Sequence, residues 1–255
     1  MPSAPVTRPI LTRQQARDFY DRFGRRQDHQ AFYERRAVDR LVELGEFGSA
    51  EAVVEFGCGT GTFAQRLMES ELSGTATYAG FDLSETMTRL TRKRLVPFGA
   101  RVSLTQTDGR PRIPLPPHSC DRFVSNYVLD LLPNQDITRT LEQAWKVLRP
   151  EGLLCLTSLT FGTNALSKLT IAAWLAIHSL KPSLVGGCRP ISLADYLGPA
   201  SWKVLYSTTM VAYGIPSQVL VARPRGHGQD QSGTHERFVP GKGTSELLTG
   251  LGTEK

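Results

Sequence analysis

The chain has 255 residues, of which 40% are hydrophobic and 21% charged, and its formal net charge is +6. This balance is typical of a globular protein with one substantial core, and it argues against a disordered or fibrous chain. The first ten residues lack the apolar stretch of a secretory signal, and no apolar run approaches the roughly 20 residues of a membrane span.

Composition also divides the chain. Residues 1–11 are rich in proline and are expected to be flexible, whereas residues 223–255 are rich in Gly, Ser, Thr and charge and are expected to be disordered. Residues 12–222 are expected to form a single domain. Residues 12–44 look helical, with a break at Gly24.

The most informative stretch is residues 53–64, Val-Val-Glu-Phe-Gly-Cys-Gly-Thr-Gly-Thr-Phe-Ala. An apolar pair and an acid precede glycines at every second position, Gly57, Gly59 and Gly61, and a helical pattern follows. This order predicts a buried parallel strand, a tight turn and a helix whose free N–H groups face a ligand. The open alternative is a glycine-rich turn of any α/β protein.

The glycine spacing and the preceding acid select among nucleotide-type cofactors. A dinucleotide site requires G-x-G-x-x-G, whereas Thr62 stands at the third glycine position here. The carboxylate of Glu55 would repel a pyrophosphate and attract a cation. S-adenosylmethionine (SAM) carries a sulfonium and an ammonium group and no phosphate, so the loop fits SAM better than NAD.

A second strand over residues 76–83 ends at Asp82. A carboxylate about 20 residues beyond the glycine loop is the expected acceptor for ribose hydroxyls. The alternative is that Asp82 caps the next helix, but Ser84, with Met87 three residues later, suits that role better.

Two further strands add candidates for the same site. A strand over 101–107 ends at Asp108 and Gly109, which could bind adenine or form a common turn. A strand beginning at Asp121 places Ser125, Asn126 and Tyr127 at its carboxyl end. Alternation of strands and helices from 52 to 160 predicts a parallel, doubly wound sheet.

The second half of the chain is expected to complete this sheet. The expected elements are a turn at Arg149–Gly152, a strand over 153–160, a helix over 164–181, a loop over 183–190, a short helix over 193–197, and an antiparallel hairpin of 202–209 with 218–222.

These ordered motifs resemble the class I SAM-dependent methyltransferases, over roughly residues 15–222. The similarity is greatest to the small-molecule branch, such as quinone-biosynthesis and phosphatidylethanolamine N-methyltransferase-like enzymes. The resemblance implies a Rossmann-like, doubly wound, mostly parallel seven-stranded sheet with a closing antiparallel hairpin and N-terminal helices as a lid. It implies in-line methyl transfer from SAM, with S-adenosylhomocysteine as product and no metal.

The resemblance also implies roles for residues. Asp82 would hold ribose, Leu83 and Met87 would pack on adenine or ribose, and Asp108 and Gly109 would bind adenine. The methionine end would meet Glu55, Gly57, Gly59 and Asn126, and Cys58, Gly61 and Tyr127 are further cofactor-binding candidates. Two departures are Asp130, where the quinone enzymes carry His, and Glu151, where Gly is frequent.

The acceptor site is expected over the carboxyl ends of the strands. Substrate-binding candidates are Tyr20, Tyr33, Trp174 and Arg189, although the aromatic residues could be core and Arg189 would suit an anionic group. Tyr20, Asp130 and His178 are weak candidates for a general base, which is needed only if the acceptor must lose a proton. His178 could instead complement a helix dipole.

Partners and compartment follow from charge and cysteines. Cys58, Cys120, Cys155 and Cys188 show no C-x-x-C spacing, which argues against zinc and favours reduced thiols in the cytoplasm. Basic residues of the N-terminal region alternate with acids, which favours a solvated helix face over nucleic-acid binding. A small-molecule acceptor is the expected partner. A membrane-surface role through residues 164–181 stays open, and so does the alternative of a non-catalytic SAM-binding or scaffold protein; the sequence leaves the oligomeric state undetermined.

Overall fold

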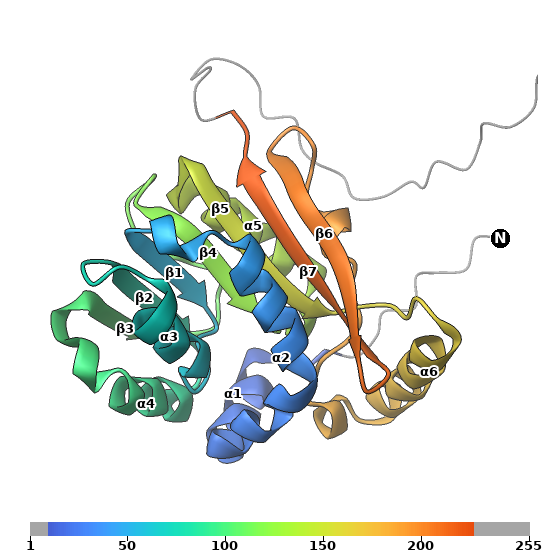
Figure 1. The fold of residues 1–255 in the computed structure, drawn as a ribbon. Coiled ribbons are helices and arrows are strands. Elements are labelled where there is room, and N and C mark those ends of the chain that lie inside the picture. Colours follow the sequence, from blue (N-terminus) through green and yellow to red (C-terminus); the bar gives the residue numbers. More distant parts are fainter. Residues whose placement is uncertain (1–9, 227–255) are drawn as a thin grey trace, which may run out of the picture.

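The strands form a single sheet in the order β3–β2–β1–β4–β5–β7–β6 (Figure 1). The computed structural model describes residues 10–226, with residues 29–31 described by their backbone alone. The strands are β1 (Ala52–Phe56), β2 (Thr77–Asp82), β3 (Val102–Gln106), β4 (Cys120–Asn126), β5 (Leu148–Leu159), β6 (Trp202–Ala212) and β7 (Ile215–Pro224).

Six α-helices connect and precede these strands. They are α1 (Arg13–Phe23), α2 (Gln27–Leu44), α3 (Thr62–Arg66), α4 (Glu85–Arg94), α5 (Asn134–Val147) and α6 (Ala165–Leu180). Shorter turns are η1 (Gly24–Arg26), η2 (Phe47–Ser49), η3 (Leu67–Glu71), η4 (Val96–Arg101), η5 (Leu129–Leu131), η6 (Pro182–Val185) and η7 (Leu193–Tyr196). Gly24, at a φ of 51°, separates α1 from α2, which confirms the expected break.

Strand pairing confirms the predicted fold class. The β1–β2, β1–β4, β2–β3 and β4–β5 pairs are parallel, and β7 pairs antiparallel with both β5 and β6. Because β1 is flanked by β2 on one side and β4 on the other, the strand order reverses at β1. Such a switch point opens a crevice at the carboxyl ends of the strands, where ligands bind in open α/β sheets.

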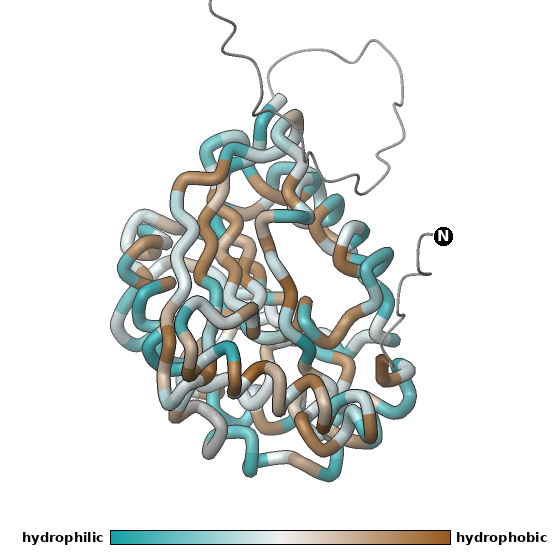
Figure 2. Tube along the Cα trace, turned by 90° about the vertical axis from the view of Figure 1, so that its right-hand side faces the viewer, coloured by the Kyte–Doolittle hydropathy of each residue, from teal (hydrophilic) through white to brown (hydrophobic). Residues whose placement is uncertain are grey.

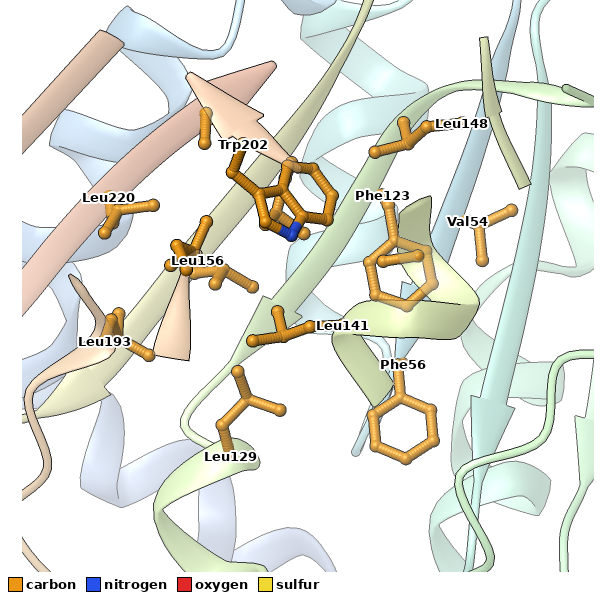
Figure 3. Close-up of a cluster of buried hydrophobic side chains, with 14 of the residues drawn as sticks. Val54, Phe56, Phe123, Leu129, Leu141, Leu148, Leu156, Leu193, Trp202 and Leu220 are labelled. Carbon is orange, nitrogen blue, oxygen red and sulfur yellow. The ribbon is translucent and has the colours of Figure 1, made fainter. Parts of the chain in front are cut away.

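Two apolar layers hold the helices on the two faces of the sheet. Apolar residues gather along the central strands and alternate with polar ones on the outer helices (Figure 2). One layer contains Phe123, Leu156 and Trp202 together with Leu141 of α5 (Figure 3). The other layer is built by residues of α2, α3 and the opposite sheet face: Tyr33, Ala37, Leu41, Ala64, Leu67, Val124, Cys155 and Val221.

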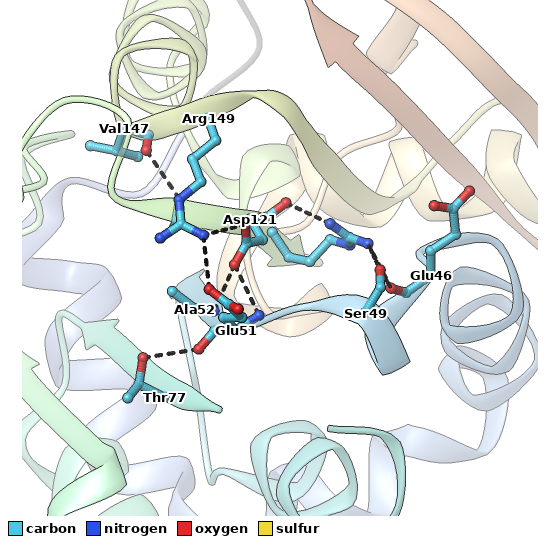
Figure 4. A network of polar contacts seen from close by, with 10 residues as sticks. Glu46, Ser49, Glu51, Ala52, Thr77, Asp121, Val147 and Arg149 are labelled. Atoms are coloured by element: carbon cyan, nitrogen blue, oxygen red, sulfur yellow. Dashed lines mark hydrogen bonds and ion pairs between the residues drawn. The ribbon is translucent and has the colours of Figure 1, made fainter. Parts of the chain in front are cut away.

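The amino ends of the central strands are joined by a polar cluster (Figure 4). The carboxylate of Asp121 accepts hydrogen bonds from the backbone N–H groups of Glu51 (2.9 Å) and Ala52 (2.8 Å). Its other oxygen pairs with the Arg149 guanidinium at 2.7 Å. One side chain therefore fixes the start of β1 relative to β4 and β5.

Several expected boundaries are wrong, and the hairpin is longer than expected, with β6 reaching Ala212 and β7 beginning at Ile215. The turn expected at Arg149–Gly152 lies inside β5: Leu148 pairs with Cys120 and Leu153 with Arg122, so residues 149–152 bulge out of a continuous strand. Strand β7 extends to Pro224, past the boundary expected at 222, because Lys203 of β6 pairs with Arg223 and Trp202 with Pro224. Residues 1–9 and 227–255, which belong to the segments expected to be flexible and disordered, lie outside the described residues.

Helix α6, predicted over 164–181, spans Ala165–Leu180 and is capped by Asn164, whose side-chain oxygen accepts a hydrogen bond from Ser167 N. No helix within residues 10–226 is both long and apolar enough to cross a membrane.

Candidate cofactor and acceptor site

A cavity of about 400 Å³ opens at the carboxyl ends of the parallel strands, where the topology predicts a ligand. Its walls are the segments that follow β1, β2, β3 and β4, and α1 contributes Arg13, Ala16 and Tyr20. The sequence-predicted residues that line it are Gly57, Gly59, Asp82, Leu83, Met87, Gly109, Asn126, Tyr127 and Tyr20. The switch point and the glycine loop are thus part of one cavity.

The glycines of the loop are required by both backbone conformation and space. Gly57 and Gly59 have φ angles of 83° and 54°, which side chains other than glycine rarely adopt. A Cβ at Gly57 would overlap the Val128 side chain, and one at Gly59 would approach the Gln27 amide at 3.2 Å. Gly61, also at positive φ, faces Thr91 and does not line the cavity.

Asp82 lies at the end of β2 with both carboxylate oxygens engaged by the main chain. One oxygen accepts a hydrogen bond from Gly59 N (2.8 Å) and the other from Ser84 N (2.8 Å). Ser84 caps α4 by accepting from Met87 N, which confirms Ser84 as the helix cap. Burial raises the pKa of Asp82 to about 6, against the effect of these hydrogen bonds.

Glu55 forms a second carboxyl group, which is buried, on the neighbouring strand. It accepts a hydrogen bond from the Tyr78 hydroxyl at 2.5 Å and one from the Asn126 amide at 3.5 Å. Burial raises its pKa to about 7, and the nearby Asp82 adds to this effect. Glu55 and Asp82 therefore make this region favourable for a cation.

A second cavity of about 470 Å³ continues the first one behind the glycine loop. The two cavities share Gln27, Gly57, Gly59 and Asn126, and the second also reaches Glu55, Cys58 and α2. An elongated ligand lying along Asn126 could therefore extend from the Asp82 region to Glu55.

Asp108 lies apart from this site. Its side chain is largely exposed, pairs with Arg110 at 3.5 Å and accepts a hydrogen bond from Arg110 N. Thr107 and Gly109, its two neighbours, line the cavity instead. The Asp-Gly pair thus contributes the backbone around Gly109 rather than the carboxylate.

The acceptor candidates gather around the loop of residues 186–189. The Tyr20 hydroxyl donates to the Gly186 carbonyl at 3.2 Å, and the Trp174 indole donates to the Cys188 carbonyl at 2.8 Å. The buried His178 imidazole lies 3.4 Å from the Gly187 carbonyl. Of Tyr20, Trp174 and His178, only Tyr20 also lines the cofactor cavity, whereas the other two support the loop.

Arg189 and Asp130 continue this cluster. The Arg189 guanidinium is buried and donates to the Leu132 carbonyl (2.6 Å) and to Asn134 (2.9 Å), so these hydrogen bonds hold the loop after β4. Asp130 is fully buried, and one of its oxygens accepts from Leu159 N at 3.1 Å. The other oxygen has no hydrogen-bond partner in the structure. Burial raises the pKa of Asp130 to about 7.

Tyr127 ends β4 in an unusual conformation. Its φ of 53° is rare for a residue with a side chain and is frequent at functional sites. Its hydroxyl donates to Ser217 at 2.7 Å, and its ring meets Tyr33 edge to face at 6.0 Å between centroids. Tyr127 lines the cavity, and Tyr33 supports it from α2.

Sequence reasoning missed several contributors from the N-terminal helices. Gln27 lines both cavities, and its buried amide oxygen has no hydrogen-bond partner among the described side chains and backbone of residues 10–226. Arg13 lines the first cavity and pairs with Asp136 of α5 at 2.7 Å. The periodicity that predicts these helices does not reveal which polar residue faces the glycine loop, because that depends on how the helices cross the sheet.

Comparison with known proteins begins with a family model described as "Methyltransferase domain", which matches residues 53–152. Part of the chain is also 28% identical, over 144 residues, to malonyl-[acyl-carrier protein] O-methyltransferase of Yersinia pestis. That match covers 56% of this chain and 50% of the relative, so the chain spans half of the length of that curated protein.

Solved structures share the fold at low sequence identity. The [4+2]-cyclase SpnF superposes with a TM-score of 0.63 at 16% identity, over 84% of this chain and 97% of that one. The N-methyltransferase NodS of Bradyrhizobium japonicum, in complex with S-adenosylhomocysteine, superposes with a TM-score of 0.58 at 16% identity, over 76% and 88%. At these identities the likeness concerns the fold alone.

Proposed function

We propose that this chain, which belongs to the class I SAM-dependent methyltransferases through its domain at residues 53–152, moves the methyl group of SAM to a small, partly hydrophobic acceptor. The observation that carries the proposal is the pair of carboxyl groups beside the glycine loop, the buried Glu55 and the half-buried Asp82, whose carboxylate accepts a hydrogen bond from Gly59 N. Both groups disfavour a phosphate and favour the positively charged methionine end of SAM.

The residues present fit SAM along the two joined cavities. Asp82 offers carboxylate lone pairs to ribose hydroxyls, and Leu83 and Met87 offer apolar contact to the adenosine part. Asn126 lies where the cavities meet and Glu55 lines the second cavity, and both suit the ammonium and sulfonium groups. SAM supplies an already activated methyl group, so the protein's work is to align the acceptor and exclude water.

Among the candidates for a general base, Asp130 has the most suitable pKa, but its carboxyl group is fully buried and lines neither cavity, so a proton would have to reach it through intervening groups. Burial and nearby carboxyl groups raise the pKa of Tyr20 well above its ordinary value, so Tyr20 keeps its proton at neutral pH and acts as a hydrogen-bond donor. Asp130 has a free oxygen and a pKa of about 7, which suits a base near neutral pH. It serves only an acceptor that must lose a proton, such as a hydroxyl or an ammonium.

Two alternatives use the same fold. A non-catalytic SAM-binding or scaffold protein would bind SAM without turnover. The chain shares its fold with a [4+2]-cyclase, so the fold alone does not imply methyl transfer, and this alternative is kept. A lipid N-methyltransferase of the phosphatidylethanolamine type would differ in its acceptor. The relative that methylates malonyl-[acyl-carrier protein] makes a carboxylate acceptor worth including in any screen.

Calorimetric titration with SAM, S-adenosylhomocysteine and NAD tests the cofactor. We expect the two sulfur ligands to bind and NAD to give no heat. Asp82→Asn should weaken SAM binding at least tenfold, whereas Asp108→Asn, whose carboxylate is exposed, should change it less than twofold. Binding of NAD in place of SAM, or equal effects of the two variants, would refute the proposed site.

A turnover assay separates the enzyme from the scaffold. Methyl transfer from labelled SAM is measured with amine, hydroxyl, carboxylate and phosphatidylethanolamine acceptors. Turnover with any of these supports the proposal and identifies the acceptor atom. SAM binding without transfer across the panel favours the scaffold alternative.

A further inference from the structure

Helix α6 is apolar on its exposed side as well as on the side that faces the protein, where Ile171, Trp174 and Leu175 lie, whereas an ordinary surface helix keeps its outer side polar. Its buried positions are Ser167, Ile171 and His178, so two of the three carry polar side chains. The exposed positions are occupied by Leu166, Leu169, Ile177 and Leu180, with alanines between them.

These exposed apolar residues form one continuous stripe. Leu166, Leu169, Ala173, Ile177 and Leu180 follow one another at spacings of three or four, which places them on one side of the helix. Leu169 is 69% exposed and Leu180 is 85% exposed. Leu184 of η6 adds a further apolar residue, 66% exposed, directly after the helix. A contiguous patch of this kind marks an interaction surface.

The charged side chains in the segment that contains the stripe are positive. Residues 152–194 contain no Asp or Glu. Lys168 and Lys181 are exposed at the two ends of α6. In Figure 1, α6 lies with α1 and α4 along the edge of the molecule at which the parallel strands end. The exposed side chains of Arg25 and Arg26, in the turn after α1, add positive charge to that edge, to which α1 and α4 also contribute the exposed acids Asp18 and Glu85.

We propose that α6 and η6 seat this protein on an anionic lipid bilayer, with the apolar stripe in the acyl boundary and the lysines among the headgroups. Apolar residues with flanking cations and no carboxylates are the pattern of an interfacial helix. A second copy of the chain fits less well, because pairing the two stripes would bring like-charged lysines together without a carboxylate between them.

The stripe is joined to the cofactor cavity through the loop that follows η6. The Trp174 indole of α6 holds this loop by donating to the Cys188 carbonyl, and Gly187 packs against Leu11, which lines the cavity. Attachment through α6 would therefore bring the cavity close to the lipid surface. This step deepens the proposed function, whereas bilayer binding itself does not depend on it.

Co-sedimentation of the full chain with vesicles tests the proposal. The vesicles contain phosphatidylcholine alone or phosphatidylcholine with phosphatidylglycerol, and SAM is absent. We expect pelleting with the anionic vesicles and little with the neutral ones. Replacing Leu169 and Leu180 together by Ser should lower the partition coefficient by about a hundredfold, from roughly tenfold for each leucine removed from the acyl boundary. Lys168→Gln with Lys181→Gln should weaken binding by about fivefold per lysine, more at low salt.

Val96→Ser is the matched control, because Val96 is also 69% exposed but lies in η4, away from α6. Its binding should equal that of the unchanged chain. Thermal melting of each variant verifies folding, and sedimentation velocity reports self-association. No pelleting of the unchanged chain, unchanged binding by the Leu169 and Leu180 variant, or dimers that dissociate in that variant would each overturn the proposal.

Discussion

The affinity for SAM should rise with pH because the proposed site has two carboxyl groups with raised pKa values, Glu55 for the cationic methionine end and Asp82 for the ribose. In the free protein, burial holds the pKa of Glu55 at about 7, so most Glu55 side chains are protonated at pH 5.5. A bound ammonium or sulfonium favours the ionised form. Binding of SAM is therefore expected to release a proton below pH 7, and the affinity should increase as pH rises through that value.

The magnitude follows from the size of the shift. If the complex returns the pKa of Glu55 to its ordinary value of 4.5, the affinity increases about 20-fold between pH 5.5 and 7.5, or about 1.8 kcal/mol. Asp82, with a pKa of about 6, adds to the lower part of this range. Keeping the pH at or below 7.5 leaves most of the SAM α-amino group charged.

Calorimetry at several pH values, in buffers of different ionisation enthalpy, measures both the affinity and the protons released. Glu55→Gln should flatten most of the dependence, and S-adenosylhomocysteine, which lacks the sulfonium charge, should show a smaller slope than SAM. An affinity that is flat or that falls between pH 5.5 and 7.5 would refute the assigned role of Glu55.

The same burial of Glu55 predicts how the unfolding free energy of the ligand-free protein changes with pH. The folded-state pKa of Glu55 lies above the unfolded one, so the folded chain binds more protons between pH 4.5 and about 7. That contribution is complete below pH 4.5 and is lost as pH rises through 7, and Glu55→Gln should remove it in urea unfolding.

Other substitutions test the loop, the strand ends and the base. Gly57→Ala should lower the unfolding free energy by about 3 kcal/mol, because of the strained φ and the overlap with Val128. Adding Val128→Ala should recover only the part of this loss that comes from the overlap. Purely additive effects of the two substitutions in urea unfolding would contradict this geometry. Asp121→Asn should lower the unfolding free energy by about 1–2 kcal/mol at pH 7, because hydrogen bonds such as the one from Ala52 N lower the folded-state pKa of Asp121 despite its burial. The difference between the variant and the unchanged chain should disappear as pH falls below 4, and a difference that stays constant with pH would exclude this linkage. Asp130→Asn should lower kcat about a hundredfold with unchanged SAM affinity and remove the acidic limb near pH 7, so an unaltered pH profile would show that Asp130 is not the base.

The sequence-predicted features that the structure confirms around the candidate site are those fixed by local rules. Alternate glycines after a buried strand require positive φ, and Gly57 and Gly59 have it. Asp82 follows the next parallel strand at the expected separation, and Ser84 follows as a helix cap because a short hydroxyl side chain suits that place. These features need no knowledge of the tertiary packing.

The remaining features depend on contacts between distant segments. Asp108 follows the third strand as expected, yet its side chain turns to Arg110 and leaves Gly109 at the cavity. Arg189 lies in a glycine-flanked loop, but its guanidinium donates a hydrogen bond to the Leu132 carbonyl in the loop after β4. The long β5 could not be foreseen from the Arg-Pro-Glu-Gly segment, because the pairing of Leu148 with Cys120 keeps both sides of that segment in one strand.

The position of β7 has a consequence for the order in which the chain can be completed during synthesis. Strand β7 lies between β5 and β6 in the sheet although it follows both in the chain, and nearly all of its residues are buried. Until β7 has left the ribosome, β5 has an unpaired edge, and β6 has no neighbouring strand on the side where β7 will lie. A nascent chain ending before Ile215 should therefore hold the whole glycine loop and still lack a closed sheet, which makes it a substrate for chaperones at that stage.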